Sequence, residues 1–269
     1  MRIVHFSDIH IGSHDAGLVD ALADTTNALT PDLVIASGDF AMAARRWELR
    51  EAAALLARLD APIVATPGNH DLPVYDLVSR FVRPLARYNR WIEPLSQRSY
   101  TDERIAVLGL NSARAFNLSL NWSHGRLGRD QIREADRFFE GCADCAFRAL
   151  VVHHPFFVPD DLPGFRRIGR GDAMLRVLAE RRVHAVFSGH LHKRGTIGRT
   201  LEIGAGPWTV HLLQVGSATS SRQREGDGPG GNGFNLIEID PGAMRVTPFA
   251  ASGTGFERRD EEAERIPLG

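Results

Sequence analysis

The sequence predicts an α/β fold made of two packed β-sheets with helices outside. Three observations support this prediction. Short apolar runs recur along the chain, helical patterns separate several of them, and the final part of the chain consists mainly of short strand-like segments. Strands that alternate with helices favour parallel pairing, whereas consecutive short strands favour antiparallel pairing.

The expected strands before His192 are short and rich in Val, Ile and Leu, without alternation, as is typical of strands covered on both faces. They span residues 2–7, 32–36, 62–66, 104–110, 149–152 and 184–188. Between several of them, apolar side chains recur at the spacing of one helical face. The expected helices are Ala16–Leu29, Trp47–Leu59, Arg129–Phe139 and Gly171–Arg182.

The chain changes character after His192, where short candidate strands dominate. They span residues 194–198, 201–205, 207–215, 234–239 and 244–250, and they predict an antiparallel sheet on one flank. Residues 252–269 are charged and contain glycine, so we expect a loosely held C-terminal tail. The sequence therefore predicts a single domain over residues 1–251, followed by this tail.

The composition is ordinary for a globular protein, with 43% hydrophobic and 24% charged residues in a chain of 269. The 32 basic and 33 acidic residues give a net charge of −1, so a strongly basic nucleic-acid-binding surface is absent. No stretch approaches the roughly 20 apolar residues of a membrane span, and the N-terminus lacks the pattern of a signal peptide. We therefore expect a cytoplasmic protein with no membrane span and no specific nucleic-acid partner.

Five clusters of carboxylate, amide and imidazole side chains each follow an expected strand. They are Asp8 with His10, Asp39, the run Asn69-His70-Asp71, the pair His153-His154, and His190 with His192. The loops at the C-terminal ends of parallel strands converge on one crevice. A single histidine near an apolar strand is usually structural, but five such clusters at five strand ends predict one common site.

These residue types suit a centre of two divalent cations. Carboxylate oxygens, amide oxygens and imidazoles are ligands for Mn, Fe or Zn. A carboxylate such as Asp39 can bridge two cations, one oxygen to each, and such a pair can hold a phosphate and activate a water. The histidines without a matching cluster are expected to be structural or at the surface, namely His5, His14, His124, His184 and His211.

The order of the five clusters resembles the calcineurin-like metallophosphoesterase superfamily. The pattern of that family is D-x-H, G-D, G-N-H-[DE], a strand-end His and G-H-x-H, and all five elements are present from Asp8 to His192. The family fold is a four-layer α-β-β-α sandwich, with two mixed β-sheets flanked by helices. This fold agrees with the one predicted from the apolar pattern.

The resemblance implies a ligand set for two divalent metal ions, Mn, Fe or Zn. One ion would be held by Asp8, His10, Asp39 and His192. The other would be held by Asp39, Asn69, His153 and His190, with Asp39 as the bridge. His153 is preferred over His154 because the family ligand lies two residues before a proline, here Pro155. His154 would then support the ligands or line the pocket.

The resemblance also makes His70 the catalytic imidazole, which would stabilise the transition state and protonate the leaving oxygen. Asp71 beside it would hold the ring, and imidazole in general changes its charge near neutral pH. A metal-bridging hydroxide would attack phosphorus in line with the leaving group.

Three segments are candidates for recognising the substrate, and each carries arginines, whose planar fork suits phosphate. They are Leu72–Trp91, read as a helix bordering the site, Asn111–Arg114, and the loop Phe156–Arg170. Most such arginines are solvated surface charges. Arg114 is the first choice because it lies nearest to a strand end. The expected substrate contacts are Asn69, Arg114 and His154.

The opening H-F-S-D-I-H, together with G-N-H-D, H-H-P and G-H-L-H, resembles class III cyclic-nucleotide phosphodiesterases and bacterial glycerophosphodiesterases. Hydrolysis of a small phosphodiester is therefore the leading expectation, with phosphomonoester or pyrophosphate hydrolysis as alternatives. A nuclease is disfavoured because a basic face is missing. A non-catalytic scaffold is disfavoured because every ligand position is filled. A homodimer is compatible with the resemblance, since dimers are common among similar enzymes.

Overall fold

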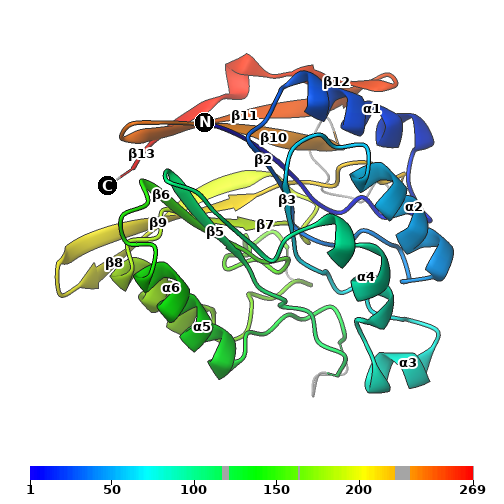
Figure 1. Cartoon of the computed structure of the whole chain (residues 1–269), viewed down its shortest axis with the longest axis horizontal. Helices are drawn as coiled ribbons and strands as arrows, with labels where there is room; N and C mark the ends of the chain where they lie inside the picture. Colours follow the sequence, from blue (N-terminus) through cyan, green and yellow to red (C-terminus); the bar gives the residue numbers. More distant parts are fainter. Residues whose placement is uncertain (117–120, 163, 222–230, 269) are drawn as a thin grey trace.

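The computed structural model describes residues 1–116, 121–162, 164–221 and 231–268. Two β-sheets pack face to face, and helices cover the outer face of each sheet (Figure 1). The predicted fold class, an α/β sandwich of two mixed sheets flanked by helices, is confirmed. Among the described residues, none of the helices has both the length and the apolar character needed to cross a bilayer.

The first sheet has the strand order β12-β11-β10-β1-β2-β3, and β13 pairs with β11. Its parallel strands are β1 (Arg2–Phe6), β2 (Leu33–Ala36) and β3 (Ile63–Ala65). Its antiparallel strands are β10 (Gly233–Asp240), β11 (Ala243–Ser252), β12 (Gly255–Arg258) and β13 (Glu264–Pro267).

The second sheet has the order β4-β5-β6-β7-β9-β8. Its parallel strands are β5 (Ile105–Gly109), β6 (Phe147–Val151), β7 (Ala185–Ser188) and β9 (Gly206–Gln214). The antiparallel edges are β4 (Ser99–Thr101) and β8 (Gly195–Ile203).

The helices form the two outer layers. The first sheet is covered by α1 (Ala16–Ala28), α2 (Arg46–Leu56) and α4 (Ala86–Trp91). The second sheet is covered by α5 (Arg129–Glu140) and α6 (Gly171–Glu180). The short helix α3 (Leu77–Val82) projects beyond α4, away from both sheets (Figure 1). Two 3-10 turns are η1 (Glu93–Leu95) and η2 (Asp260–Glu262).

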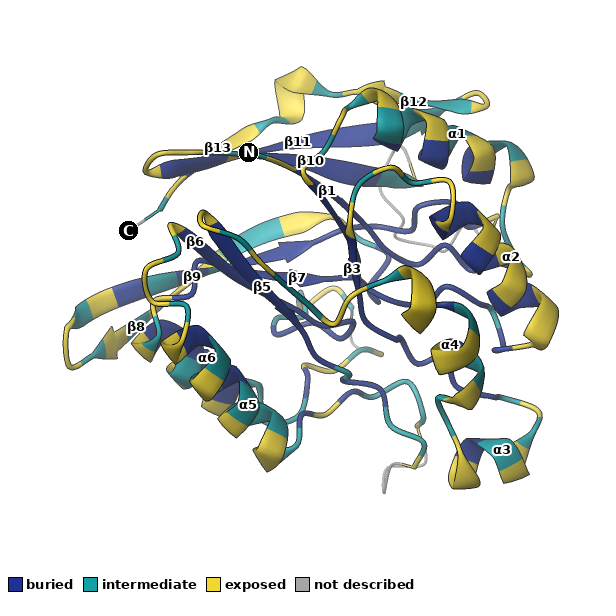
Figure 2. Cartoon of the chain, in the orientation of Figure 1, coloured by how far each residue is buried: buried dark blue, intermediate teal, exposed yellow. Residues whose placement is uncertain are grey.

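Three apolar layers hold these elements together, one between the sheets and one under each helical layer. Ile35 and Val64 of the first sheet meet Val107 and Phe187 of the second in the central layer. The central parallel strands are therefore buried on both faces (Figure 2). This double burial explains why their sequences are continuous apolar runs rather than alternating ones.

The final part of the chain differs from the prediction of one antiparallel flank. Strands β8 and β9 extend the second sheet, whereas β10 to β13 extend the first. The ranges 194–198 and 201–205, expected as two strands, both overlap the single strand β8, which spans Gly195–Ile203. Strand propensity does not say which sheet a strand joins, because pairing partners are chosen by tertiary packing.

The prediction of a loosely held tail over residues 252–269 is wrong for its described part. Strand β12 pairs with β11, and β13 pairs with another stretch of β11. Charged side chains dominate because these are edge strands, in which Ile266 is buried and its neighbours face solvent. The segment Leu72–Trp91 also differs from the single expected helix. It is divided into α3 and α4 at Pro84, which lacks a backbone donor.

Candidate metal centre

The five predicted clusters meet at one end of the sandwich. Asp8 and His10 follow β1, Asp39 follows β2, and Asn69 follows β3. The remaining members come from the second sheet, where His153 follows β6, and His190 and His192 follow β7. All these strands run parallel to a neighbour, so their C-terminal ends lie at the same edge. All of these side chains are buried or nearly so.

One group of donor atoms surrounds Asp8. The Oδ1 atom of Asp8 lies 3.2 Å from Nε2 of His192 and 3.5 Å from Nε2 of His10. The two histidine Nε2 atoms lie 3.1 Å apart. Ser217 Oγ lies 3.0 Å from Nδ1 of His192 and holds that ring from the other side. Three electron-rich atoms therefore converge, and a cation between them would remove their mutual repulsion.

A second group surrounds His153. Its Nδ1–H donates to the Ser37 carbonyl oxygen over 2.8 Å, so in the neutral ring Nε2 carries the lone pair. That Nε2 lies 3.2 Å from Oδ2 of Asp39 and has no hydrogen-bond partner among the described residues. The ring nitrogens of His153, His154 and His190 lie within 4.8 Å of one another. A ring held by a carbonyl, with its other nitrogen facing a carboxylate, is typical of a histidine metal ligand.

Asp39 lies between the two groups. Its Oδ2 is 3.2 Å from His153 Nε2 and 3.9 Å from His10 Nε2. Its Oδ1 accepts the backbone N–H of His70 at 2.8 Å. Oδ2 is thus the oxygen that approaches a histidine nitrogen of each group, so Asp39 is placed to serve both groups.

Asn69, which follows strand β3, is a candidate for a further donor. The residue is buried, and its Oδ1 has no partner among the described residues. An amide oxygen of this kind is destabilising when it is buried without a partner, and a cation would satisfy it.

The backbone at the site is held in a sparsely populated conformation. Nine described non-glycine residues have positive φ, and five of them are predicted ligands. These five are Asp8, His10, Asp39, His190 and His192, with φ between 53° and 73°. Such strain persists only where the surroundings impose it, and it concentrates at functional sites.

Two glycines allow the loops to approach so closely. A Cβ at Gly68 would lie 2.0 Å from Oδ1 of Asp39, and one at Gly189 would lie 2.3 Å from Oδ2 of Asp8. Any side chain at either position would push a carboxylate out of place. The glycines of the G-N-H-D and G-H-L-H motifs are therefore required by packing.

The charges of the site follow from burial and from these contacts. Burial works against ionisation of Asp8 and Asp39, yet the neighbouring histidines hold the pKa of each carboxyl well below its usual range. Burial lowers the pKa of His153, but the carboxylates of Asp39 and Asp8 outweigh it and raise that pKa to about 9. Burial, and then His153, lower the pKa of His190 to about 3, which keeps its ring neutral.

His70 lies at the edge of the cluster, partly exposed. Its ring packs edge-on against His10, with centroids 5.1 Å apart. Its Nδ1–H donates to the Met42 carbonyl oxygen over 2.7 Å. The expectation that Asp71 orients this ring is wrong, because Asp71 accepts the backbone N–H groups of Ala41 and Gly68 instead. Burial, and then the charge of Asp39, raise the pKa of Asp71 to about 8.

His154 and Arg114 are both committed to protein partners. The Nε2–H of His154 donates to the Ser123 carbonyl oxygen at 3.0 Å, and its Nδ1 lies 2.7 Å from the Ser112 hydroxyl. The guanidinium of Arg114 donates to the Arg126 carbonyl and to the Gln131 side chain. Both ring nitrogens of His154 are therefore occupied inside the fold, and Arg114 uses Nε and one terminal nitrogen there, while their contact with a substrate stays a prediction.

Several neighbours of the site were not found from the sequence. Phe165, from the segment Phe156–Arg170, packs edge-on against His190 with centroids 5.4 Å apart. Ser217 follows strand β9, and its place directly after a strand end is a signal that could have revealed it. Phe165 lies within a long loop and gave no such signal.

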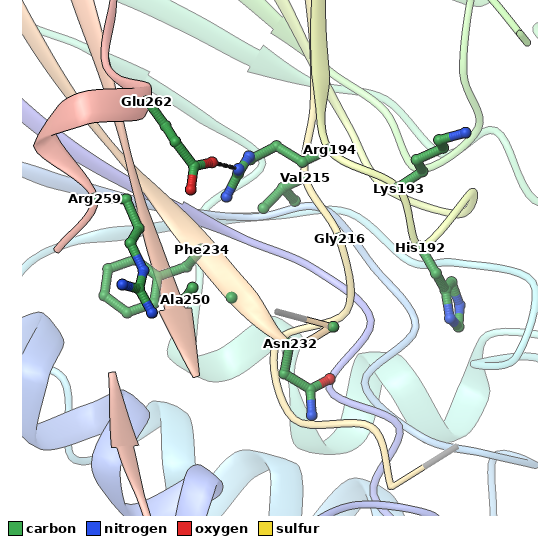
Figure 3. Close-up of a pocket in the computed structure, with 12 residues that line it drawn as sticks. His192, Lys193, Arg194, Val215, Gly216, Asn232, Phe234, Ala250, Arg259 and Glu262 are labelled. Carbon is green, nitrogen blue, oxygen red and sulfur yellow. Dashed lines mark hydrogen bonds and ion pairs between the residues drawn. The ribbon is translucent and has the colours of Figure 1, made fainter. Parts of the chain in front are cut away.

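A cavity of about 590 Å³ borders the site at His192. Figure 3 shows its other walls, among them Arg194, which is ion-paired with Glu262, and Arg259 from the C-terminal segment. The His192 ring is directed away from this ion pair (Figure 3). The cavity therefore flanks the cluster of donor atoms and does not contain it.

Comparisons with known proteins agree with this geometry. The sequence profile of the calcineurin-like phosphoesterase family matches residues 1–194. No curated protein matches the sequence. Among solved structures, a dimetal phosphatase from Danio rerio is similar over 100% of this chain and 99% of its own, with 12% identity and a TM-score of 0.64.

Two more solved structures have the same fold. The purple acid phosphatase PPD1 from yellow lupin seeds is 14% identical, with a TM-score of 0.63, over 99% of this chain and 53% of its own. The protein TT1561 of Thermus thermophilus is 12% identical, with a TM-score of 0.51, over 100% of this chain and 99% of its own. On the family match, which covers most of its length, the chain belongs to the calcineurin-like phosphoesterase family.

Proposed function

We propose that the protein is a metal-dependent phosphodiesterase that hydrolyses a small phosphodiester at the strand-end cluster. The observation that carries this proposal is the position of Asp39 Oδ2 between two groups of potential metal-binding atoms. Asp8, His10 and His192 form one group, while His153 and His190 lie together in the other, to which we assign Asn69. When bound, two divalent cations, such as Mn, Fe or Zn, would neutralise the phosphate charge and activate a water.

The residues around the donor atoms keep them in position. Ser37 O and Ser217 Oγ each hold one histidine ring, so that its other nitrogen faces the cluster. Asp71 ties the backbone of Ala41 to that of Gly68 and thereby fixes the loops that carry Asp39 and Asn69. Its proposed role is therefore to position ligands, not to transfer a proton.

His70 is placed to act on the leaving oxygen. Because Nδ1–H donates to Met42 O, Nε2 is the nitrogen left for a substrate. In the protonated ring, Nε2–H would donate to the departing alkoxide, and general acid catalysis of this type typically contributes 10²–10⁴-fold. The preference for diesters rests on the resemblance of the motifs to cyclic-nucleotide phosphodiesterases and glycerophosphodiesterases. The cytoplasmic location and the homodimer remain predictions.

The test is a comparison of two chromogenic substrates on the manganese-loaded protein. We expect faster hydrolysis of bis-p-nitrophenyl phosphate than of p-nitrophenyl phosphate. Faster monoester hydrolysis would replace the diesterase by a monoesterase of the same family. No turnover of either substrate, with metals bound, would favour a non-catalytic scaffold. A pyrophosphate hydrolase would be recognised by turnover of a nucleotide-sugar substrate in place of both.

A further inference from the structure

We infer that helix α3 and its surroundings form a docking surface for an anionic lipid bilayer. The surface consists of six apolar side chains and three arginines. The apolar side chains are those of Tyr75, Leu77, Val78, Phe81, Val82 and Phe116. The arginines are Arg46, Arg83 and Arg90. We call this set the α3 surface.

Exposed apolar side chains are concentrated here. Eight large hydrophobic residues are strongly exposed in the described part of the chain, and five of them fall between Tyr75 and Val82. Val78 is 75% exposed and Val82 is 71% exposed, although both lie in a helix. An exposed apolar patch of this kind marks a site that interacts with a protein or a membrane.

The helix is fixed in this outward position by a buried arginine. Arg80 is the buried residue of α3, and its guanidinium donates to the carbonyl oxygens of Pro73 and Ala115. The guanidinium also lies over the ring of Trp122, 4.2 Å from its centroid. The segment ending at Phe116 is thereby joined to α3. The apolar side chains are consequently presented by an anchored element.

The charges nearby favour an anionic partner. Arg46, Arg83 and Arg90 line a cavity of about 500 Å³ together with the pair Arg87 and Asp76. Within the described residues, none of the three forms an ion pair with a carboxylate. By contrast, exposed arginines such as Arg58 and Arg181 each pair with two carboxylates.

Apolar side chains flanked by unpaired arginines match the two requirements of a bilayer surface. The apolar groups would enter the interface, and the arginines would bind headgroup phosphates. The net charge of the whole chain is −1, so attraction to an anionic surface would have to come from this local arrangement. Because α3 follows Asp71 closely in sequence, docking would hold the strand-end site near the headgroup layer.

Vesicle co-flotation tests this inference without relying on catalysis, since it uses the full-length protein without added metal. We expect the protein to float with vesicles of phosphatidylcholine and phosphatidylglycerol, and more weakly with phosphatidylcholine alone. Phe81→Ser and Val82→Ser should each lower partitioning roughly tenfold on both vesicles. Arg83→Gln and Arg90→Gln should each lower it about fivefold, on the anionic vesicles only.

Matched controls come from outside the α3 surface. Leu95→Ser removes an exposed apolar side chain from η1, and Arg176→Gln removes an exposed arginine from α6. Neither should change flotation. Circular dichroism and thermal unfolding show that each variant is folded.

Three results would overturn the inference. The first is a folded wild-type protein that stays unbound with both vesicle types. The second is flotation that the four variants leave unchanged. The third is a lipid-free dimer, found by sedimentation, that Phe81→Ser converts to a monomer, because the α3 surface would then belong to a second copy of the chain. Failure of the phosphodiesterase assay would leave these outcomes unaffected.

Discussion

A buried histidine lies near each end of strand β7, and the two histidines have different surroundings. His184 precedes the strand, stacks on Phe147 with centroids 5.5 Å apart, and meets the edge of Trp208. Its Nδ1 accepts the backbone N–H of Arg148. His190 follows the strand and lies among the rings of His153, His154 and Phe165, beside carboxylates.

The difference shows that position in the sheet decides what a buried histidine can do. At the N-terminal end of β7, the surroundings are aromatic rings and a backbone donor, so a neutral imidazole is satisfied within the fold. At the C-terminal end, the loops of five parallel strands deliver donor atoms with like polarity, and these need a cation between them. Burial lowers the pKa of both rings, but only one end forms a centre.

The strongest way to separate the two ends is Asp39→Ala. The substitution removes the one oxygen that lies between both donor groups, so we expect loss of metal at both positions and no measurable turnover. Metal content and diester hydrolysis would be measured together. The matched variant is His184→Asn, which should retain metals and activity. Retention of full activity by Asp39→Ala would remove Asp39 from the centre.

The next largest effect is expected from His70→Ala. The ring does not belong to either donor group, so both metals should remain bound. Loss of the proton donor should lower kcat by roughly 10²–10⁴-fold for a substrate with a poor leaving group. The decrease should be smaller for bis-p-nitrophenyl phosphate, because nitrophenolate needs little protonation. An equal decrease for both substrates would contradict the role of His70 as an acid.

The adjacent pair His153 and His154 offers a comparison within the centre itself. His153→Gln should lose metal, because its Nε2 is the atom that faces Asp39. His154→Gln should keep both metals and instead destabilise the fold by about 1–3 kcal/mol, because buried partners such as Ser112 lose a hydrogen bond. Metal analysis and urea unfolding distinguish the two results. If His154→Gln loses metal and His153→Gln keeps it, His154 is the ligand instead of His153.

The last prediction concerns the N-terminal end of β7 and changes stability without changing metal content. Burial lowers the pKa of His184 to about 4, below its ordinary value of 6.5. The unfolded chain therefore takes up a proton at higher pH than the folded one. The stabilising contribution is complete above pH 6.5 and is lost as the pH falls towards 4, by about 3 kcal/mol. Urea unfolding at several pH values should show that the free energy of unfolding depends less on pH in His184→Asn than in the wild type. The same pH dependence in both proteins would contradict this contribution of His184.

The strand-end residues could be predicted because their signal is local. Each cluster directly follows its own apolar run, so the sequence alone placed Asp8, Asp39, Asn69 and His190 at one edge. The roles of the neighbours were not predictable in the same way. For example, both ring nitrogens of His154 are hydrogen-bonded, but their partners Ser112 and Ser123 belong to a different loop.

Asp71 illustrates the same limit. Its place beside His70 in the sequence suggested a side-chain contact, yet the turn directs its carboxylate to backbone N–H groups. The C-terminal strands show the limit at the level of the fold. Their apolar pattern predicted strands, but their division between two sheets depends on long-range pairing, such as that of β1 with β10. Arg114 shows the limit for a predicted substrate contact, because its hydrogen bond to the Arg126 carbonyl joins residues 12 positions apart in the chain.

We propose that Asp39 joins two cation sites, and metal stoichiometry tests this role most directly. The protein would be loaded with manganese, freed of excess metal by gel filtration, and analysed by plasma mass spectrometry. We predict two ions per chain in the wild type, fewer in His153→Gln and in His192→Ala, and none in Asp39→Ala. A folded wild-type protein that retains one ion or none, or an Asp39→Ala variant that retains two, would contradict the account.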